Sequence, residues 1–190
     1  MKHQNPGCGG GHDDPAQPLR EALASIIAEV RPVEGFECVA TRAALDRVLF
    51  APVHSTVDVP AHTNSAMDGY ALAGAALPAE GERAFSVVGS SFAGHPFDGT
   101  VGEGECVRIM TGATVPAGAD TVIMQERVRR DGDTAVIGAG HRAGDNVRRA
   151  GEDLAAGAVA LEPGVRLRPA HLGLIASLGI SEVRVRRRPR

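Results

Sequence analysis

The sequence has 190 residues, a formal net charge of −3 and an apolar fraction of 43%, which fits one large or two small folded domains. The slightly negative charge argues against a general nucleic-acid binder, and no apolar run approaches the roughly 20 residues of a membrane helix. Three cysteines, Cys8, Cys38 and Cys106, without close spacing favour a reducing cytoplasm over a disulfide scaffold.

The first part of the chain combines a polar leader with helical patterns. Residues 1–18 are rich in Gly, Asp, His and Pro and are expected to form a mobile leader. An apolar stripe of helical spacing predicts a helix from Leu19 to Arg31, which Pro32 ends. An extended piece at residues 37–40 follows, and Thr41 then suits the N-cap of a second helix that carries Ala44, Leu45, Val48 and Leu49 and ends at Pro52.

The middle of the chain, from Val53 to about Ala160, has short Val- and Ile-rich runs between glycines and prolines, a pattern typical of β structure. The predicted strands include residues 85–88, 106–110, 121–124 and 134–137, with a hairpin turn at residues 130–133. Helical spacing returns after Pro169 and ends before Gly179, and residues 181–186 form a last strand.

This order of elements predicts an α+β protein in which both chain ends build a mixed α/β base domain. We expect residues 19–55 and 155–190 to form the base and residues 56–154 to form an inserted β-rich domain. The arginine-rich end of the chain, from Arg184 to Arg190, is interpreted as a solvated charge run on a strand that leaves the domain.

Familiar catalytic motifs are missing from the sequence. It has no phosphate-binding loop of the Gly-x-x-x-x-Gly-Lys-Ser/Thr type, no dinucleotide fingerprint and no His-Glu-x-x-His. Ser91 lies near two glycines, but the second glycine is one residue too late for a nucleophile elbow.

Three segments of the middle region carry possible chemistry. The first holds Asp68 immediately before Gly69, the second ends a strand in Thr111-Gly112-Ala113, and the third sets Arg148 and Arg149 beside Glu152 and Asp153. The first and second can be ordinary polar turns, and the third can be a surface ion-pair cluster. Alternatively, the hydroxyl and backbone N–H groups of the second can hold an anion beside the acids of the other two.

Two carboxylates beside a phosphate repel it, since like charges about 4 Å apart cost roughly 4 kcal/mol at an effective dielectric constant near 20. A hard divalent cation removes this penalty, and Mg²⁺ is the usual partner of carboxylates and phosphates. If the segments meet on one rim, Asp68 and Asp153 therefore indicate a magnesium-dependent reaction of a phosphorylated substrate.

Several longer motifs occur in an order that resembles one enzyme family. They are Asp58-Val59-Pro60, Asn64-Ser65-Ala66-Met67-Asp68-Gly69-Tyr70-Ala71, Arg108-Ile109-Met110-Thr111-Gly112-Ala113, Ala119-Asp120-Thr121-Val122-Ile123-Met124-Gln125-Glu126, Arg148-Arg149-Ala150-Gly151-Glu152-Asp153 and Leu174-Ile175-Ala176-Ser177-Leu178-Gly179. From about Leu19 to Arg190 the chain resembles the molybdopterin molybdenumtransferases, the family of bacterial MoeA and the gephyrin E-domain.

The resemblance implies an enzyme of molybdenum cofactor biosynthesis that inserts molybdenum from molybdate into molybdopterin adenylate, releases AMP and uses Mg²⁺. By the same analogy Asp68, Thr111 and Asp153 are expected to be catalytic, with Asp68 and Asp153 holding the cation. The residues expected to bind the substrate are Asn64, Ser65, Met67, Gly69, Gly112, Arg148 and Arg149. The resemblance also implies a homodimer, and the cysteine usage noted above favours the cytoplasm.

Family members continue into a pterin-binding α/β domain with a Ser-Thr-Gly-Asp-Glu-type motif and a C-terminal β domain, and the 190 residues contain neither. Because the family's cleft lies between two subunits, this chain is expected to supply about half of a site and to be inactive alone. Two other hypotheses remain open at this stage: a non-catalytic dimerisation or docking module, and an unrelated Mg²⁺-dependent phosphohydrolase.

Overall fold

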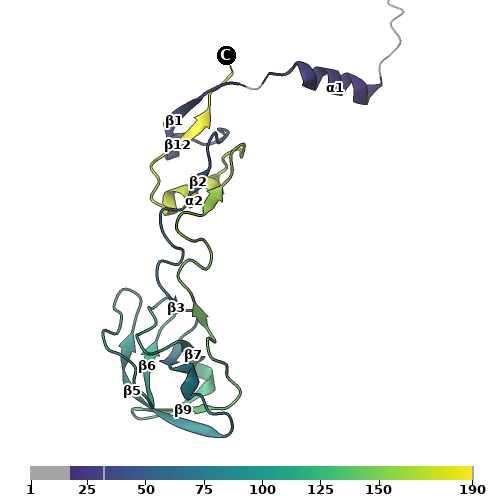
Figure 1. Cartoon of the computed structure of the whole chain (residues 1–190). Coiled ribbons are helices and arrows are strands. Elements are labelled where there is room, and N and C mark those ends of the chain that lie inside the picture. The colour runs from purple at the N-terminus through teal and green to yellow at the C-terminus, as the bar shows by residue number, and fades with distance from the viewer. Residues whose placement is uncertain (1–17, 32, 190) are drawn as a thin grey trace, which may run out of the picture.

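The structure is a computed structural model that describes residues 18–31 and 33–189. It is an α+β fold in which two bodies lie at the ends of an elongated molecule, with helix α1 projecting beyond one of them (Figure 1). The predicted leader at residues 1–18 lies outside the described residues except for Pro18. No helix in the described part of the chain is long and apolar enough to cross a membrane.

The first body is made from both ends of the described chain. Strand β1 (Phe36–Ala40) pairs antiparallel with β12 (Glu182–Arg186), and β2 (Val53–His54) pairs with β11 (Val159–Leu161). Helix α2 (Pro169–Ser177) begins with proline at its first position, where the missing N–H costs nothing. The core of this first body joins residues more than a hundred positions apart. Among them are Leu49, Leu167, Ile175 and Val185, all 0% exposed.

The second body is a six-stranded sheet with the order β7-β4-β6-β5-β9-β8. Its strands are β4 (Gly69–Leu72), β5 (Glu82–Ser91), β6 (Glu105–Ile109), β7 (Thr121–Met124), β8 (Val128–Asp131) and β9 (Thr134–Gly138). All neighbours are antiparallel except β5 and β6. One apolar cluster gathers around Phe85 and Ile123, and another around Ile109 and Val122. A two-stranded sheet of β3 (Asn64–Ser65) and β10 (Val147–Arg148) lies at the rim.

Most predicted elements are confirmed within a few residues. The first helix is α1 (Leu19–Glu29), and the strands predicted at residues 121–124 and 134–137 are β7 and β9. The hairpin turn also forms where Asp131 pairs with Thr134 and Gly132 has φ 56°. Two short 3-10 helices, η2 (Gly74–Ala76) and η3 (Gln125–Arg127), complete the sheet body.

The helix predicted to start at Thr41 is wrong. Only one 3-10 turn forms there, η1 (Thr41–Ala43), and Asp46 has φ 63°, which a right-handed helix does not allow. The Thr41 hydroxyl donates to the Ile180 carbonyl instead of capping a helix, at 2.8 Å. Val48 and Leu49 form β-bridges to Arg166 and Val185, so pairing with the end of the chain overrides the local helical spacing.

Candidate functional site

The two short strands β3 and β10 join the three chemical segments at one rim of the six-stranded sheet. In β3, Ser65 lies opposite Val147 of β10, and Asn64 lies opposite Arg148. On the other edge of β3, the Ser65 N–H donates to the Ala113 carbonyl at 3.0 Å, and the Gly112 N–H donates to the Ser65 carbonyl at 2.8 Å. Segments that are about 80 residues apart in sequence therefore form one hydrogen-bonded unit.

Asp68 is fixed by Thr111, which lies in the turn that follows strand β6. The Thr111 hydroxyl donates to Asp68 Oδ1 at 2.6 Å, and the Thr111 backbone N–H donates to the same oxygen at 2.8 Å. These two hydrogen bonds, together with the charge of Arg108, hold the pKa of Asp68 below its ordinary value of 3.8. The carboxylate thus stays ionised, and no hydrogen bond within the described chain uses its second oxygen, Oδ2.

Strand pairing and backbone hydrogen bonds fix the position of Asp68 next to Thr111. Gly69 follows it at the start of β4 and lies between Ile109 and Met124 of the flanking strands. The Gln125 N–H donates to the Asp68 carbonyl at 3.0 Å, which fixes the backbone on the other side. Ser65 is 1% exposed, and its hydroxyl donates to the Met67 carbonyl at 2.5 Å. The backbone around Asp68 is therefore held by β6 and β7 on either side of Gly69, by Gln125 and by the Ser65 hydroxyl.

Asp153 is held in a different way. Its Oδ2 accepts a hydrogen bond from the Arg148 guanidinium at 2.5 Å, and Glu152 lies 3.9 Å from the same arginine. The hydrogen bond and charge of Asp153 raise the pKa of Arg148 above its ordinary value. The surrounding turn is tied down because the Gly151 N–H donates to the Pro60 carbonyl and the Asp153 N–H donates to the Val59 carbonyl.

The structure thus brings together some of the expected site residues and separates others. Asp68 and Thr111 are in direct contact, and Asn64, Gly112 and Arg148 lie in the strands and turn around Ser65. No hydrogen bond or ion pair among the described residues joins this pair to Asp153. Met67 and Arg149 are exposed, whereas Ser65 and Gly69 are buried, so the latter two lie beneath the surface of the rim.

Arg108 and Gln125, which stand in motifs of the sequence but were not among the expected site residues, complete the surroundings of Asp68. Arg108 lies over the Tyr70 ring, 5.1 Å from its centroid, and donates a hydrogen bond to the Gln125 side chain. Arg108 interrupts the apolar residues Cys106, Val107 and Ile109 of β6, and that interruption was the signal available in the sequence. Nearby, Asn146 lines a hollow of about 340 Å³ together with Met124, Arg127 and His141.

No cluster of three or more His, Cys, Asp or Glu side chains that could hold a metal ion occurs within residues 18–31 and 33–189. Mg²⁺, however, is commonly bound by one or two carboxylates together with the oxygens of a phosphorylated substrate. Asp68 Oδ2 fits such a role, because it is anionic and unpaired in the described chain. Asp153 fits it less well, since Arg148 already neutralises it.

The structure is thus an α+β protein with an ionised aspartate and a hydroxyl-bearing turn in contact at the rim of a six-stranded sheet. Comparison with known proteins identifies the family. Residues 17–179 match the model of the MoeA N-terminal region (domain I and II), and the chain belongs to this family.

The similar proteins agree with this assignment. The chain is 42% identical over 167 residues to the molybdopterin molybdenumtransferase of Haemophilus influenzae, covering 87% of this chain and 41% of that protein. It is 34% identical over 171 residues to the enzyme of the same name from a Nostoc species, covering 88% of this chain and 39% of the other. The molybdopterin biosynthesis MoeA protein of Pyrococcus horikoshii superposes with a TM-score of 0.82 at 33% identity, over 90% of this chain and 46% of that one. The chain thus spans about two fifths of the length of these curated relatives.

Proposed function

We propose that this chain is the N-terminal portion of a molybdenum cofactor biosynthesis enzyme that inserts molybdenum from molybdate into adenylylated molybdopterin and releases AMP. The relatives' shared name and the family match support the biosynthetic role. The observation that carries the chemical proposal is the contact between the ionised Asp68 and Thr111 at 2.6 Å. The proposed domain boundaries are residues 19–55 and 155–190 for the base and 56–154 for the inserted β domain.

In this proposal the rim residues have separate roles. Asp68 would hold the cation, and the two hydrogen bonds from Thr111 to Oδ1 keep its carboxylate in one orientation. When bound, Mg²⁺ supplies positive charge that neutralises the substrate's phosphate oxygens. The backbone around Gly112 approaches the substrate closely, while Ser65 and Gly69 position the acid from below.

Asp153 and Arg148 are proposed to form the second part of the substrate site. An arginine beside a phosphate donates two hydrogen bonds in a fixed fork, so Arg148 suits the anionic part of the substrate when Asp153 releases it. Arg149, Asn64 and Met67 are proposed to line the same opening. We further propose a cytoplasmic homodimer in which a second subunit's remaining domains close the site.

The test is Asp68→Asn in the full-length polypeptide that carries this region, supplied with molybdopterin adenylate, molybdate and Mg²⁺. Because the substitution keeps the shape and removes the charge, we expect AMP release and molybdenum incorporation to fall by about a hundredfold or more. Asp133→Asn is the matched control, since it makes the same change in the exposed β8–β9 turn and should leave the rate unchanged. An Asp68→Asn enzyme with the wild-type rate would refute the role given to this acid.

A further inference from the structure

The donors of the turn that follows strand β6 are already used within the chain. The Thr111 N–H and hydroxyl both donate to Asp68 Oδ1, at 2.8 and 2.6 Å. The Gly112 and Ala113 N–H groups donate to backbone carbonyls at 2.8 and 3.0 Å. An anion bound beside Asp68 would therefore take its hydrogen bonds from another element.

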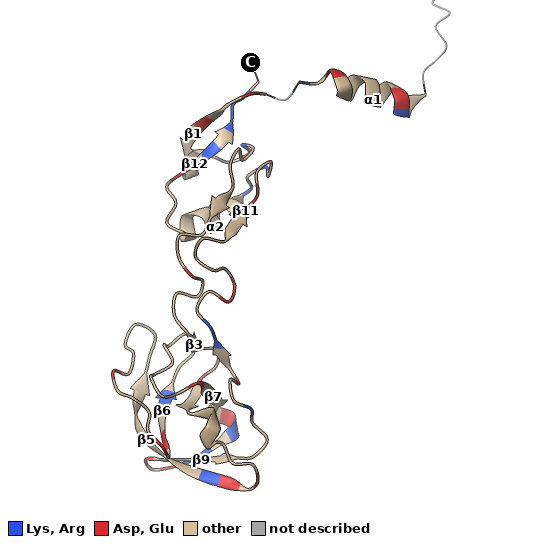
Figure 2. Cartoon of the chain, in the orientation of Figure 1, with Lys and Arg blue, Asp and Glu red and all other residues tan. Residues whose placement is uncertain are grey.

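Arg108 of strand β6 lies on the same face of the sheet as Asp68. It pairs with Tyr70 of β4, and Tyr70 comes two residues after Asp68, so the three side chains project to one side. In Figure 2 the blue segment of β6 marks the single basic residue of this strand. After the two hydrogen bonds from Thr111, the charge of Arg108 also lowers the pKa of Asp68. No ion pair joins the two side chains, so Arg108 lies near the acid without neutralising it.

Three neutral groups hold the Arg108 guanidinium. It lies 5.1 Å from the centroid of the Tyr70 ring, and Tyr70 is 4% exposed. Its Nη1 donates to the Gly69 carbonyl at 3.4 Å, and its Nη2 donates to the side-chain oxygen of Gln125. The side-chain nitrogen of Gln125 donates in turn to Glu126 at 3.1 Å, which fixes the orientation of this amide. An arginine that is already held in place loses less freedom when it binds a ligand.

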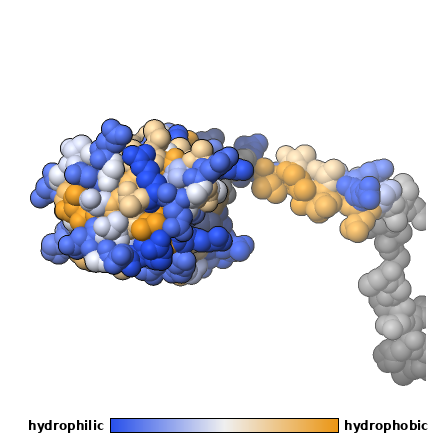
Figure 3. Space-filling model, turned by 90° about the horizontal axis from the view of Figure 1, so that it is seen from below, coloured by the Kyte–Doolittle hydropathy of each residue, from blue (hydrophilic) through white to orange (hydrophobic). Residues whose placement is uncertain are grey.

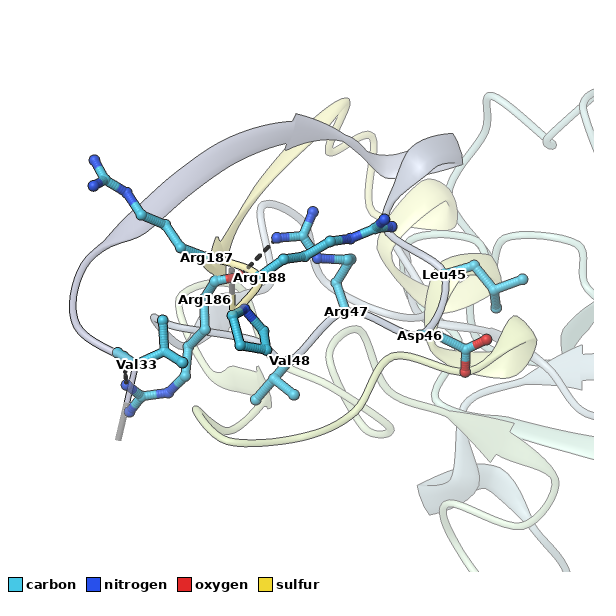
Figure 4. A pocket seen from close by; sticks show the side chains of 9 residues that line it. Val33, Leu45, Asp46, Arg47, Val48, Arg186, Arg187 and Arg188 are labelled. Carbon is cyan, nitrogen blue, oxygen red and sulfur yellow. Dashed lines mark hydrogen bonds between the residues drawn. The ribbon is translucent and has the colours of Figure 1, made fainter. Parts of the chain in front are cut away.

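Arg47 of the base body shows the opposite case. It is 8% exposed, pairs with Glu37 and donates to the Arg186 carbonyl at 2.7 Å (Figure 4). Arg108 has no ion pair with any described residue. Its Nε–H and the second hydrogen of each terminal nitrogen have no acceptor in the described chain. Arg108 thus keeps a full positive charge and donors that are still free.

A tetrahedral oxyanion fits these donors. A guanidinium presents pairs of N–H groups that match the oxygens of such an anion. The exposed neighbours Thr111 and Gln125 are polar, whereas the most exposed large apolar side chains lie on or beside α1, at the far end of the molecule (Figure 3). The surroundings of Arg108 therefore favour a small anion over an apolar partner surface.

We infer that Arg108 binds a tetrahedral oxyanion of the substrates beside Asp68, either the phosphate of the adenylate or molybdate. The inference rests on the proposed function and adds a binding residue to the same site. Arg108 differs from Arg148 in being ready to bind, because Asp153 occupies Arg148 whereas no acid occupies Arg108.

The test is an NMR titration of the whole chain with inorganic phosphate or with molybdate, without Mg²⁺. We expect a saturable shift of the Arg108 Nε–H signal and of the Gln125 backbone N–H signal. Followed at Gln125, Arg108→Gln should raise the dissociation constant of the oxyanion at least about tenfold. Arg108→Lys keeps the charge but not the paired donors, so its dissociation constant should lie between the two.

Arg83→Gln is the matched control. Arg83 also lies over an aromatic ring, 5.3 Å from the centroid of Phe85, and donates to the Ala76 carbonyl at 3.0 Å. It stands near the start of β5, away from Asp68, so its replacement should leave oxyanion binding unchanged. The amide spectra of both glutamine variants show whether the sheet body keeps its fold.

Asp68→Asn separates this inference from the proposed function. Without Mg²⁺ this variant should bind phosphate about two- to fivefold more tightly, because it removes a charge that repels the anion. Added Mg²⁺ should tighten phosphate binding to the wild-type chain but not to Asp68→Asn. If Mg²⁺ has no effect while binding still requires Arg108, the cation role of Asp68 fails and the inference stands.

Two results would overturn the inference. One is a wild-type chain that shows no saturable shift with either oxyanion, and the other is an Arg108→Gln chain that binds as tightly as the wild type. Where binding requires Arg108, the oxyanion with the lower dissociation constant identifies which substrate group the arginine receives.

Discussion

The segments that carry Asp68 and Asp153 are linked by the pairing of β3 with β10, but they hold their acids by opposite means. Asp68 is bound by neutral donors, the hydroxyl and the N–H of Thr111, so the pair keeps a full negative charge. Asp153 is bound by the Arg148 guanidinium, so that pair has no net charge. An acid fixed by neutral groups remains available to a cation, whereas an acid fixed by arginine must first be released. The comparison therefore favours Asp68 over Asp153 as a ligand of the proposed cation.

Each loop contains a glycine at a position where a side chain would clash or strain the backbone. The largest expected effect on stability comes from replacing Gly69, the glycine beside Asp68. A Cβ at Gly69 would lie 2.0 Å from the Ile123 carbonyl oxygen, a backbone atom of strand β7 that cannot move without breaking the sheet. Gly151 has φ 72°, and its Cβ would lie 3.0 Å from Asp58 Oδ1, the end of a side chain. We expect Gly69→Ala to lower the free energy of unfolding by about 3 kcal/mol or more and Gly151→Ala by about 1–2 kcal/mol.

Urea unfolding of the two variants measures this difference, with Gly138→Ala as the control. A Cβ at Gly138 has only one neighbour, at 4.0 Å, so this substitution should change the free energy of unfolding by less than about 0.5 kcal/mol. If Gly151→Ala proved as destabilising as Gly69→Ala, the Asp153 loop would be as tightly built into the fold as the Asp68 loop, contrary to the comparison.

A smaller effect is expected from breaking the ion pair of the second loop. The Arg148 and Asp153 side chains are 38% and 54% exposed, so solvent screens their attraction. A double-mutant cycle of Arg148→Met and Asp153→Asn should give a coupling free energy below about 1 kcal/mol, and added salt should reduce it. A coupling of several kcal/mol, unaffected by salt, would show that Asp153 is not free to leave Arg148.

The sequence predicted four strands of the six-stranded sheet and the motifs that meet at its rim, because both depend on local patterns, but it did not predict the short rim strands β3 and β10. Residues 121–123 are all β-branched, and Gly112, with φ 79°, supplies the turn that follows β6. The sequence left open whether Arg148 belongs to a surface ion-pair cluster or binds an anion, and it could not decide that Arg148 pairs with Asp153, because this contact depends on how the turn at Gly151 folds onto residues 59–63. The wrong helix at Thr41 has a similar cause, since Leu49 pairs with a strand that lies 136 residues later, at Val185.

The finest distinction between the two loops lies in the pKa of Asp68, which Thr111→Val should raise toward its ordinary value of 3.8. Valine keeps the shape of threonine but removes the hydroxyl donor, the largest cause of the lowered pKa, while the backbone N–H of residue 111 still donates. A lowered pKa in the folded state means that the carboxylate stabilises the fold above its unfolded pKa, and that this contribution is lost as the pH falls through the folded pKa. In the variant, that loss should begin at a higher pH. An NMR titration of the Asp68 carboxyl carbon measures the shift, with Thr114→Val as the control because no hydrogen bond joins its hydroxyl to Asp68. An unchanged pKa in Thr111→Val would mean that the backbone amide alone fixes the acid and that the hydroxyl is free to face the substrate's oxyanion.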